Sequence, residues 1–487
     1  MTARARALES HRPVLVSFSM PASTIDPLNV LESCVNASRN GSRIASLSAE
    51  GLVYWSSPAD DFAFVGLGAA TTIVHEGPDR FQAVDAEWSA LLEAAITSNS
   101  SGGLGMGPML IGGFAFHSDG PHAAEWYGFA AAHLIAPRLL IGSVNGRCFV
   151  TFSALVGDDG ELDVSAGDLF SLYQNGSLLW ERESVGSTSS GFDTEVSFRD
   201  ATTEAEWCAL VATALDAINR HELEKVVLAR AVRATASRKI PAVAALAHLR
   251  PEHPDAFVFG YWRGETAFIG ASPERLVRLD GRNLSASSLA GTAKRGATDR
   301  EDAEVAAMLL ASEKNAIEHT FVRDSLVAEL GKVCDDVTAD AAPSLMSMAH
   351  VHHLHTNVTG RLRFDHSLLD VVGLLHPTPA VGGMPREAAI RFIDRHECLD
   401  RGWYSAPFGW IGRGGGEFAV ALRCGVIAGE EAVLFAGCGI VAGSDPDHEL
   451  AESALKLQPM KLAIGAALAD SAYPTRTVPV AGERVET

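Results

Sequence analysis

The sequence predicts an α+β fold, in which groups of strands are separated by helices. The chain has 487 residues, of which 47% are hydrophobic and 20% charged, so it holds enough apolar material for a large core. Runs rich in β-branched and aromatic residues follow one another in groups joined by Gly-rich or polar turns. Regular alternation of one strand and one helix is absent, and so is a repeat of fixed period, which argues against a parallel sheet or a solenoid.

The first half of the chain, residues 1–200, is predicted to be β-rich. Residues 181–200 are polar and rich in Ser and Gly, which is typical of a surface connection to the second half. The strands of the first half are expected at residues 51–57, 62–71, 109–116, 139–155 and 169–174.

The second half, residues 201–465, has stronger periodic patterns. Apolar residues at helical spacing predict a helix over 203–222, and further helices are expected around 301–331 and 384–399. A polar tail, residues 466–487, ends the chain. The strands of the second half, several of them joined by Gly turns, are expected within residues 225–235, 256–291 and 403–443.

Bulk properties exclude several classes of partner. The formal charge of −21 argues against a nucleic-acid partner, because phosphate binding needs a concentrated basic surface. Seven scattered cysteines without a C-x-x-C pair indicate reduced thiols in a cytosolic protein. No apolar stretch is long enough for a signal peptide or a membrane span. The sequence therefore predicts a cytoplasmic protein with no membrane partner, and positive contacts to any anionic substrate must be local.

The closing helix presents charged residues on one face. Asp445 can cap its N-terminus, and Pro446 suits the first helical position. Glu449, Glu452 and Lys456 then stand at positions i, i+3 and i+7, which share one side of a helix. In an isolated helix this pattern is usually a solvated ion-pair stripe.

A further carboxylate makes a metal site conceivable. Glu318, in a charge-rich predicted helix, would complete with Glu449 and Glu452 a carboxylate set suited to Mg²⁺, which takes oxygen ligands. The His-rich stretch 350–355 is the one place for zinc, but its histidines alternate as in a strand. The Gly-rich stretch 412–418 is better interpreted as a hairpin turn than as a phosphate loop.

Two further polar residues stand at positions where chemistry is possible. Lys225 begins a predicted strand, where a lysine is usually at the surface. A buried amine can instead lose its proton and act as a general base. Glu274 follows a Gly-Ala-Ser-Pro turn between two strands, a place from which a side chain can point into a cleft, although a solvated carboxylate is the ordinary interpretation.

Nine sequence motifs occur one after another over about residues 202–465. Together they resemble the chorismate-utilising enzyme family, and within it the isochorismate synthases. The motifs are KVVLARAV, GASPERLV, LAGTAKRG, SEKNAIEHTFVRDSL, HLHTNVTGRL, HPTPAVGGMP, WYSAPFGWIG, VALRCGVI and GSDPDHELAESALKL.

The resemblance implies a fold and a set of roles. The fold would be one large intertwined α+β unit, with an active site between two packed β-sheet layers flanked by helices. Lys225 resembles the base that deprotonates water for attack at C2 of chorismate. Glu274 resembles the acid that protonates the departing C4 hydroxyl, and His353 resembles a histidine near that hydroxyl. The resemblance also implies a Mg²⁺ cofactor that binds the ring carboxylate. Its protein ligands would be Glu318, Glu452 and Glu449, the last directly or through a water.

The physical chemistry agrees with these implied roles. Water is a poor nucleophile and hydroxide a poor leaving group, so the reaction needs a base on one side of the ring and an acid on the other. The acid must keep its proton near neutral pH, which requires a raised pKa for Glu274. The remaining substrate contacts implied by the resemblance are Gly291, Thr292, Ala380, Tyr404, Arg423, Gly437, Gly439 and Lys456.

The branches of the family differ at few positions. Aminating members and salicylate synthases generally carry a Thr where this chain has Ala380, and anthranilate synthases lack the lysine that matches Lys225. The resemblance therefore implies water addition and release of isochorismate, by a monomer that needs no amidotransferase partner. The alternatives are a salicylate synthase, which goes on to eliminate pyruvate, an aminating enzyme, a chorismate-binding regulator without turnover, and a purely structural α+β protein.

Overall fold

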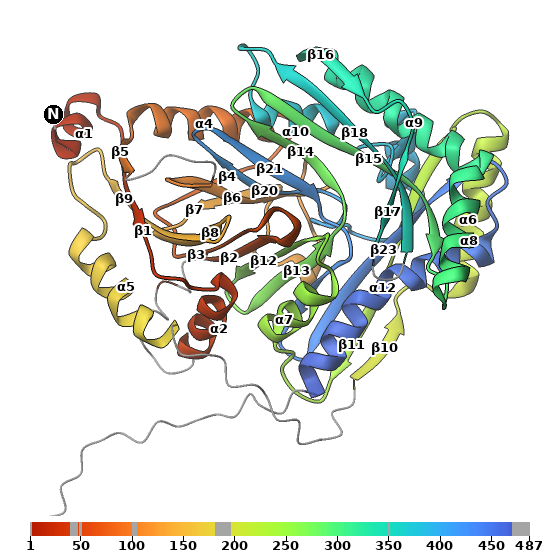
Figure 1. Cartoon of the computed structure of the whole chain (residues 1–487), viewed down its shortest axis with the longest axis horizontal. Helices are drawn as coiled ribbons and strands as arrows, with labels where there is room; N and C mark the ends of the chain where they lie inside the picture. The colour runs from red at the N-terminus through yellow and green to blue at the C-terminus, as the bar shows by residue number, and fades with distance from the viewer. Residues whose placement is uncertain are drawn as a thin grey trace, which may run out of the picture.

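The computed structural model describes residues 2–38, 47, 51–99, 105–180, 196–348 and 351–469. The strands lie in the middle of the molecule and most helices lie around them (Figure 1). Among the described residues the strands form one sheet of 13 strands and a second sheet of 10. No helix of this described part is long and apolar enough to cross a membrane. The α+β fold class with two sheets is thus confirmed.

The larger sheet combines strands from both halves of the chain. Its ladders are antiparallel, apart from the parallel pair β1–β5. The strand order is β10 (Val196–Asp200), β11 (Lys225–Ala236), β23 (Glu431–Val441), β22 (Cys424–Ala428), β13 (Thr266–Ser272), β12 (Phe257–Arg263), β2 (Leu52–Ser57), β3 (Phe62–Leu67), β8 (Leu139–Val144), β9 (Arg147–Val156), β1 (Val14–Pro21) and β5 (Ile96–Asn99), with β19 (Gly383–Met384) paired to β11.

The smaller sheet is antiparallel throughout and also joins both halves. The strand order is β16 (Cys334–Ala339), β18 (Val351–Leu362), β15 (Asn283–Lys294), β14 (Arg275–Asp280), β21 (Gly415–Val420), β20 (Pro407–Gly412), β6 (Met109–Phe114), β7 (Ala132–Ala136) and β4 (Thr71–His75), with β17 (Ser344–Ser347) paired to β18.

Aromatic side chains fill the space between the two sheets. Phe259 of the larger sheet stacks on Phe408 of the smaller one, with ring centroids 4.8 Å apart. Trp55 stacks on the same ring at 6.1 Å. All three side chains are almost completely buried. Such ring pairs each contribute about 0.5–1.5 kcal/mol beyond the burial of their apolar area, so they hold the two layers together.

The helices cover the outer faces and ends of the sheets (Figure 1). The last helix, α12, packs against α7, α6 and β23 and so covers part of the larger sheet. The helices are α1 (Ala3–Ser10), α2 (Pro27–Ser38), α4 (Arg80–Ala94), α5 (Ala166–Trp180), α6 (Glu204–Asn219), α7 (Ala242–Glu252), α8 (Asp299–Ala311), α9 (Glu313–Leu330), α10 (Leu368–Leu375), α11 (Arg386–His396) and α12 (Pro446–Ala469), with short 3₁₀ turns at Pro58–Asp60 and Ala124–Trp126.

Several predicted elements are found where the sequence placed them. The helix predicted over 203–222 is α6, and it begins with a capping box in which Thr203 and Glu206 satisfy each other's backbone N–H groups. The Gly-rich stretch 412–418 is the hairpin turn between β20 and β21, as predicted. Asp445 caps α12, since its Oδ1 accepts a hydrogen bond from the N–H of His448 at 2.9 Å.

Other predictions were wrong in detail. Residues 169–174 belong to helix α5 rather than to a strand. The connection predicted over 181–200 includes strand β10, and its residues 181–195 lie outside the described part of the chain. The helix predicted over 301–331 is two helices, because Ser312 ends α8 and caps α9 through a hydrogen bond from the N–H of Asn315.

The predicted tail also differs at its start. Helix α12 continues to Ala469, so residues 466–469 of the predicted polar tail are helical, and residues 470–487 lie outside the described part. The division of the chain at residue 200 stays a prediction, although each sheet contains strands from both sides of it.

Candidate active site

A cavity of about 340 Å³ lies where β11 and β23 of the larger sheet face β15 and β18 of the smaller one, with α12 along its side. This volume lies within the range of small-molecule sites. The residues singled out from the sequence that line the cavity are Lys225, Glu274, Gly291, Thr292, His353, Ala380, Tyr404, Arg423, Gly437, Gly439, Glu449, Glu452 and Lys456. Glu318 lies on α9, which also supplies the cavity-lining Asn315, but its side chain is outside the described part of the structure.

The acid and the base candidates are both buried in this cavity. Lys225 begins β11 and is 3% exposed, and Glu274 lies between β13 and β14 and is 5% exposed. Burial raises the pKa of Glu274 to about 7, and the positive charges of Lys225 and Lys456 oppose this rise. A carboxyl group with such a pKa keeps its proton part of the time near neutral pH, so Glu274 can donate a proton there.

The backbone holds Glu274 on both sides. Its N–H donates to Ser272 Oγ at 3.2 Å, and its carbonyl accepts from the N–H of Val420 at 3.0 Å. The hydroxyl of Ser272 in turn donates to the carbonyl of Val420. The Ser-Pro-Glu turn is therefore tied to β21, which keeps the carboxyl group aimed into the cavity.

A buried arginine and a neutral histidine form a second wall. Arg423 Nη2 donates to His353 Nε2 at 3.0 Å, and His353 Nδ1 lies 3.1 Å from Thr292 Oγ1. Burial and the charges of Arg423 and Lys456 hold the pKa of His353 well below its usual value. Because Nε2 accepts from Arg423, the single imidazole proton is assigned to Nδ1. Burial lowers the pKa of Arg423 to about 10, so it stays charged at neutral pH.

A β-bulge explains how Thr292 meets His353. The register between β15 and β18 shifts between Ala290 and Thr292, so Gly291 is the extra residue. Its φ of +79° lies in the left-handed region that glycine adopts without strain. The bulge brings Thr292 directly opposite His353, which their hydrogen bond requires.

Carboxylates gather at the start of α12. Ligand atoms of His448, Glu449 and Glu452 all lie within 4.8 Å of one another, and they are the one such group among the described residues. Two carboxylates at the edge of a polar cavity fit Mg²⁺, which keeps several waters and takes its remaining ligands from an anionic substrate. Lys456 Nζ lies 2.8 Å from Glu452 Oε1 and donates to the carbonyl of Gly437 at 3.0 Å.

His448 is the residue of this group that the sequence reasoning missed. It lines the cavity and stands four residues before Glu452, a spacing that places two side chains on the same face of a helix. This i, i+4 relation of an imidazole and a carboxylate was visible in the sequence and is a common metal-ligand spacing.

The cavity thus combines a proton donor, a buried amine, an arginine and a carboxylate pair suited to a divalent cation. These groups suit a small polyanionic substrate whose reaction moves protons on two sides.

Comparison with known proteins identifies the class. Residues 2–465 match the family model described as chorismate binding enzyme, so the chain belongs to that family. Among its relatives, the salicylate biosynthesis isochorismate synthase of Pseudomonas aeruginosa is 35% identical over 95% of this chain and 92% of its own length. Isochorismate synthase MenF of Bacillus subtilis is 32% identical over 94% of this chain and 95% of its own length.

Solved structures support the fold. MenF, the menaquinone-specific isochorismate synthase from Escherichia coli, superimposes with a TM-score of 0.72 over 95% of this chain and 100% of its own, at 24% identity. Anthranilate synthase component I from Streptococcus pneumoniae gives 0.67 at 21% identity. At such low identity these two likenesses establish the fold alone.

Proposed function

We propose that this protein is an isochorismate synthase, which converts chorismate to isochorismate reversibly. The observation that carries the proposal is that Lys225 and Glu274 line one cavity, in which Glu274 has a pKa of about 7. A protein that only bound chorismate would need neither a base nor an acid at this place. The two relatives that match almost the whole chain carry the name isochorismate synthase.

The atoms and protons of the proposed reaction balance between the substrate, water and the side chains of Lys225 and Glu274. Lys225 in its neutral form takes a proton from water, and the water oxygen bonds to C2. The two ring double bonds shift, the C4–O bond breaks, and Glu274 gives its proton to the departing hydroxyl, which leaves as water. One water enters and one leaves, so product and substrate are isomers. The proton on Lys225 must then pass to Glu274 or to solvent before the next turnover.

The remaining groups bind and orient the substrate. Arg423 is positively charged and buried, and it faces the cavity beside His353, so it supports a contact to a substrate carboxylate. His353, which the resemblance places near the leaving hydroxyl, is held neutral, and its two ring nitrogens bind Arg423 and Thr292, so it supports a role in orienting these two groups rather than that of a charged acid. Gly291, Thr292, Ala380, Tyr404, Gly437, Gly439 and Lys456 complete the proposed substrate contacts.

A divalent cation, Mg²⁺, is part of the proposal. Glu449 and Glu452, with Glu318 from α9, would hold it, and when bound it supplies positive charge to the ring carboxylate. Chelation of divalent cations is therefore expected to abolish turnover, and Mg²⁺ is expected to restore it. We also propose a cytoplasmic monomer that works without an amidotransferase partner.

The direct test is incubation of the purified protein with chorismate and Mg²⁺, followed by chromatography of the products. We expect isochorismate. Salicylate with pyruvate would instead identify a salicylate synthase, and binding without a product would identify a regulator. An amino product formed only with added ammonium salt would identify an aminating enzyme. Each of these three results contradicts the proposal.

The role of Lys225 has its own test. Lys225→Ala removes the proposed base but none of the proposed charge contacts to the substrate, so chorismate should bind with its dissociation constant changed by less than about 3-fold while kcat falls by about 10²- to 10⁴-fold. Calorimetric titration with chorismate and steady-state kinetics measure the two quantities. Equal kcat in the wild type and the variant would refute the assignment.

A further inference from the structure

Strand β11 carries Lys225 and has an incomplete edge. One edge pairs with β23 along the strand from Lys225 to Thr235. Along the other edge, β19 pairs with Lys225 and Val226, and β10 pairs with Val232 to Ala236. Between these two partners, in the described part of the chain, no strand covers the segment 227–231. The N–H of Val227 donates to the carbonyl of Gly382 at 2.9 Å, and the carbonyl of Ala231 accepts from the N–H of Ala201 at 3.0 Å. The backbone groups between these two need partners of another kind.

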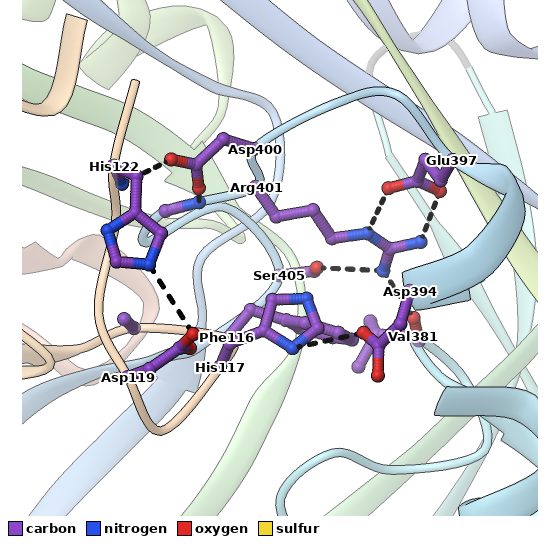
Figure 2. Close-up of polar contacts among 12 residues, drawn as sticks. Phe116, His117, Asp119, His122, Val381, Asp394, Glu397, Asp400, Arg401 and Ser405 are labelled. Carbon is purple, nitrogen blue, oxygen red and sulfur yellow. Dashed lines mark hydrogen bonds and ion pairs between the residues drawn. The ribbon is translucent and has the colours of Figure 1, made fainter. Parts of the chain in front are cut away.

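Two side chains supply such partners at the middle of this segment. Arg401 Nη2 donates to the carbonyl of Val227 at 2.7 Å, and Glu397 Oε2 accepts from the N–H of Ala229 at 2.9 Å. The two side chains also bind each other, with Nε 2.6 Å from Oε1 and Nη2 2.8 Å from Oε2 (Figure 2). The Arg401–Glu397 pair therefore provides the hydrogen bonds to β11 that the backbone of a neighbouring strand would otherwise provide.

The same arginine reaches a second wall of the cavity. Arg401 Nη1 donates to the carbonyl of Val381 at 2.9 Å and to Ser405 Oγ at 3.4 Å (Figure 2). Val227 and Val381 both line the cavity, and Val381 directly follows Ala380. One guanidinium group thus connects the strand of Lys225 with the neighbouring 380–382 loop, whose Gly382 carbonyl also accepts from the N–H of Val227 at 2.9 Å.

The pair is buried and anchored from outside. The side chain of Arg401 is 0% exposed and that of Glu397 is 1% exposed. The guanidinium lies over the ring of Phe116, 4.4 Å from its centroid. Asp400, the preceding residue, accepts a hydrogen bond from the N–H of His122 at 2.6 Å (Figure 2). It accepts another from the N–H of Ala123 at 2.7 Å.

Energetics favours a geometric role for this pair. A buried ion pair is weak evidence for stability, because removing two charges from water costs about as much as their attraction returns. An arginine with five fixed donors nevertheless holds its acceptors in a rigid fork. Here the acceptors are two backbone carbonyls from two neighbouring segments that line one cavity and a carboxylate that binds a third backbone group.

We propose that Arg401 and Glu397 are positioning residues, which hold the base Lys225 at its working distance from the substrate by completing the open edge of β11. The proposal deepens the isochorismate synthase function and rests on it. Neither side chain is among the residues that line the cavity, so both act through the backbone of β11 and of the 380–382 loop.

The test compares Arg401→Lys with Arg250→Lys as a matched control. A lysine cannot serve all of the acceptors that Arg401 binds. Arg250 also forms a bidentate pair, with Asp26 at 2.7 and 2.6 Å, in which the side chains are 31% and 33% exposed, and neither residue lines the cavity. For Arg401→Lys we expect kcat for chorismate to fall about 10- to 100-fold with KM changed less than about 3-fold, because displacement of a catalytic group by about 1 Å has an effect of this size. Arg250→Lys should leave both constants within about 3-fold of wild type.

Hydrogen–deuterium exchange provides a readout that does not depend on activity. Peptides that contain residues 225–231 should exchange faster in Arg401→Lys than in wild type, because Glu397, the acceptor of the Ala229 N–H, is then no longer held rigidly. In Arg250→Lys the exchange rate of these peptides should equal that of wild type. If Arg401→Lys does not fold, Glu397→Gln replaces it, since the amide keeps the shape and one acceptor oxygen but loses the charge.

The outcomes separate this inference from the proposed function. If the wild-type protein makes no isochorismate, the proposed function is overturned. The exchange rates then test only whether Arg401 and Glu397 hold β11 in place. Faster exchange in β11 together with a fall in kcat at unchanged KM supports the inference. Unchanged exchange, or faster exchange with wild-type kcat, overturns it.

Discussion

At the scale of single residues, the cavity owes its chemistry to burial. Glu274 and His353 have their pKa values moved in opposite directions by the same cause, since removal from water disfavours a carboxylate in one case and an imidazolium in the other. The result is a protonated acid and a neutral imidazole close to neutral pH. The protonated carboxyl group is the state that protonation of a leaving hydroxyl requires.

The raised pKa of Glu274 predicts a pH dependence of stability. A carboxyl group with a folded pKa of about 7 and an unfolded value of 4.5 binds more protons in the folded protein between these pH values. The free energy of unfolding therefore falls as pH rises from 4.5 to 7. Glu274→Gln removes this loss, so at pH 8 the variant should be more stable than wild type by up to about 3 kcal/mol. Denaturant titrations at pH 4.5 and pH 8 measure the difference.

The same variant provides the catalytic control. Wild-type kcat should decline above pH 7 as Glu274 loses its proton, and Glu274→Gln should lose most of its activity at every pH. A variant that is both stable and active at pH 8 would contradict the assignment of Glu274 as the acid.

His448 predicts a change in metal preference. An imidazole beside two carboxylates favours Mn²⁺ over Mg²⁺, because nitrogen ligands suit transition metals better than magnesium. His448→Ala should weaken Mn²⁺ binding about 10-fold and Mg²⁺ binding by less than about 3-fold. Electron paramagnetic resonance of Mn²⁺, with Mg²⁺ as competitor, measures both affinities without a catalytic assay. Substitution of the exposed His122, which does not line the cavity, is the control. Equal losses for the two metals would contradict the predicted preference, and unchanged affinities for both would exclude His448 as a ligand.

At the scale of elements, close approach between backbones shapes the cavity. Strand β23 contributes Gly437, where an added Cβ would lie 2.7 Å from the carbonyl oxygen of Leu228 and 2.9 Å from Tyr404 Oη. A side chain at this position is thus excluded by the neighbouring strand and by a residue of the cavity wall. The carbonyl of Gly437 also accepts from Lys456, which connects β23 with α12.

Gly437→Ala is therefore expected to disturb both packing and binding. The methyl group forces β11 or Tyr404 to move, which should lower the free energy of unfolding by about 1–3 kcal/mol and raise the KM for chorismate. Thermal unfolding and steady-state kinetics provide the measurements. Gly414→Ala is the matched control, because an added Cβ there has no atom within 4 Å. If both variants behave as wild type, the contact with Tyr404 is not needed for the shape of the cavity.

At the scale of the whole molecule, the chain is interlaced rather than divided. The pairs β12–β2 and β20–β6 join strands of the first 200 residues to later strands in both sheets. The aromatic contacts between the sheets add further connections, such as that of Trp55 to Phe408. Among the described residues, each sheet and the largest core cluster combine residues from both halves.

This interlacing predicts one cooperative unfolding transition. Differential scanning calorimetry should give a van't Hoff enthalpy close to the calorimetric one, because neither half keeps its core when the other unfolds. Separate expression of residues 1–200 and 201–487 should yield chains without cooperative transitions. Two resolved transitions in the intact protein would instead support two independent domains.

The sequence predicted the fold class and most strands, because runs of β-branched and aromatic residues are typical of strands with a buried face. It failed at residues 169–174, where a short apolar run fits a strand and a buried helical turn equally well. The candidate site was predicted as a list of residues, most of which the fold brings to one cavity. The partners of Val227 and Ala229 were not predictable, since a missing neighbour strand is a property of the folded sheet and not of any local pattern.

The open edge of β11 has a last consequence, which concerns association between molecules. Unpaired backbone groups in an edge strand invite the addition of a strand from another copy, the first step toward aggregates. Arg401 and Glu397 occupy that edge with charged side chains that a foreign strand would have to displace and leave buried without partners. The two residues proposed to position the base would therefore also keep a strand of another copy from pairing with residues 227–231 of β11.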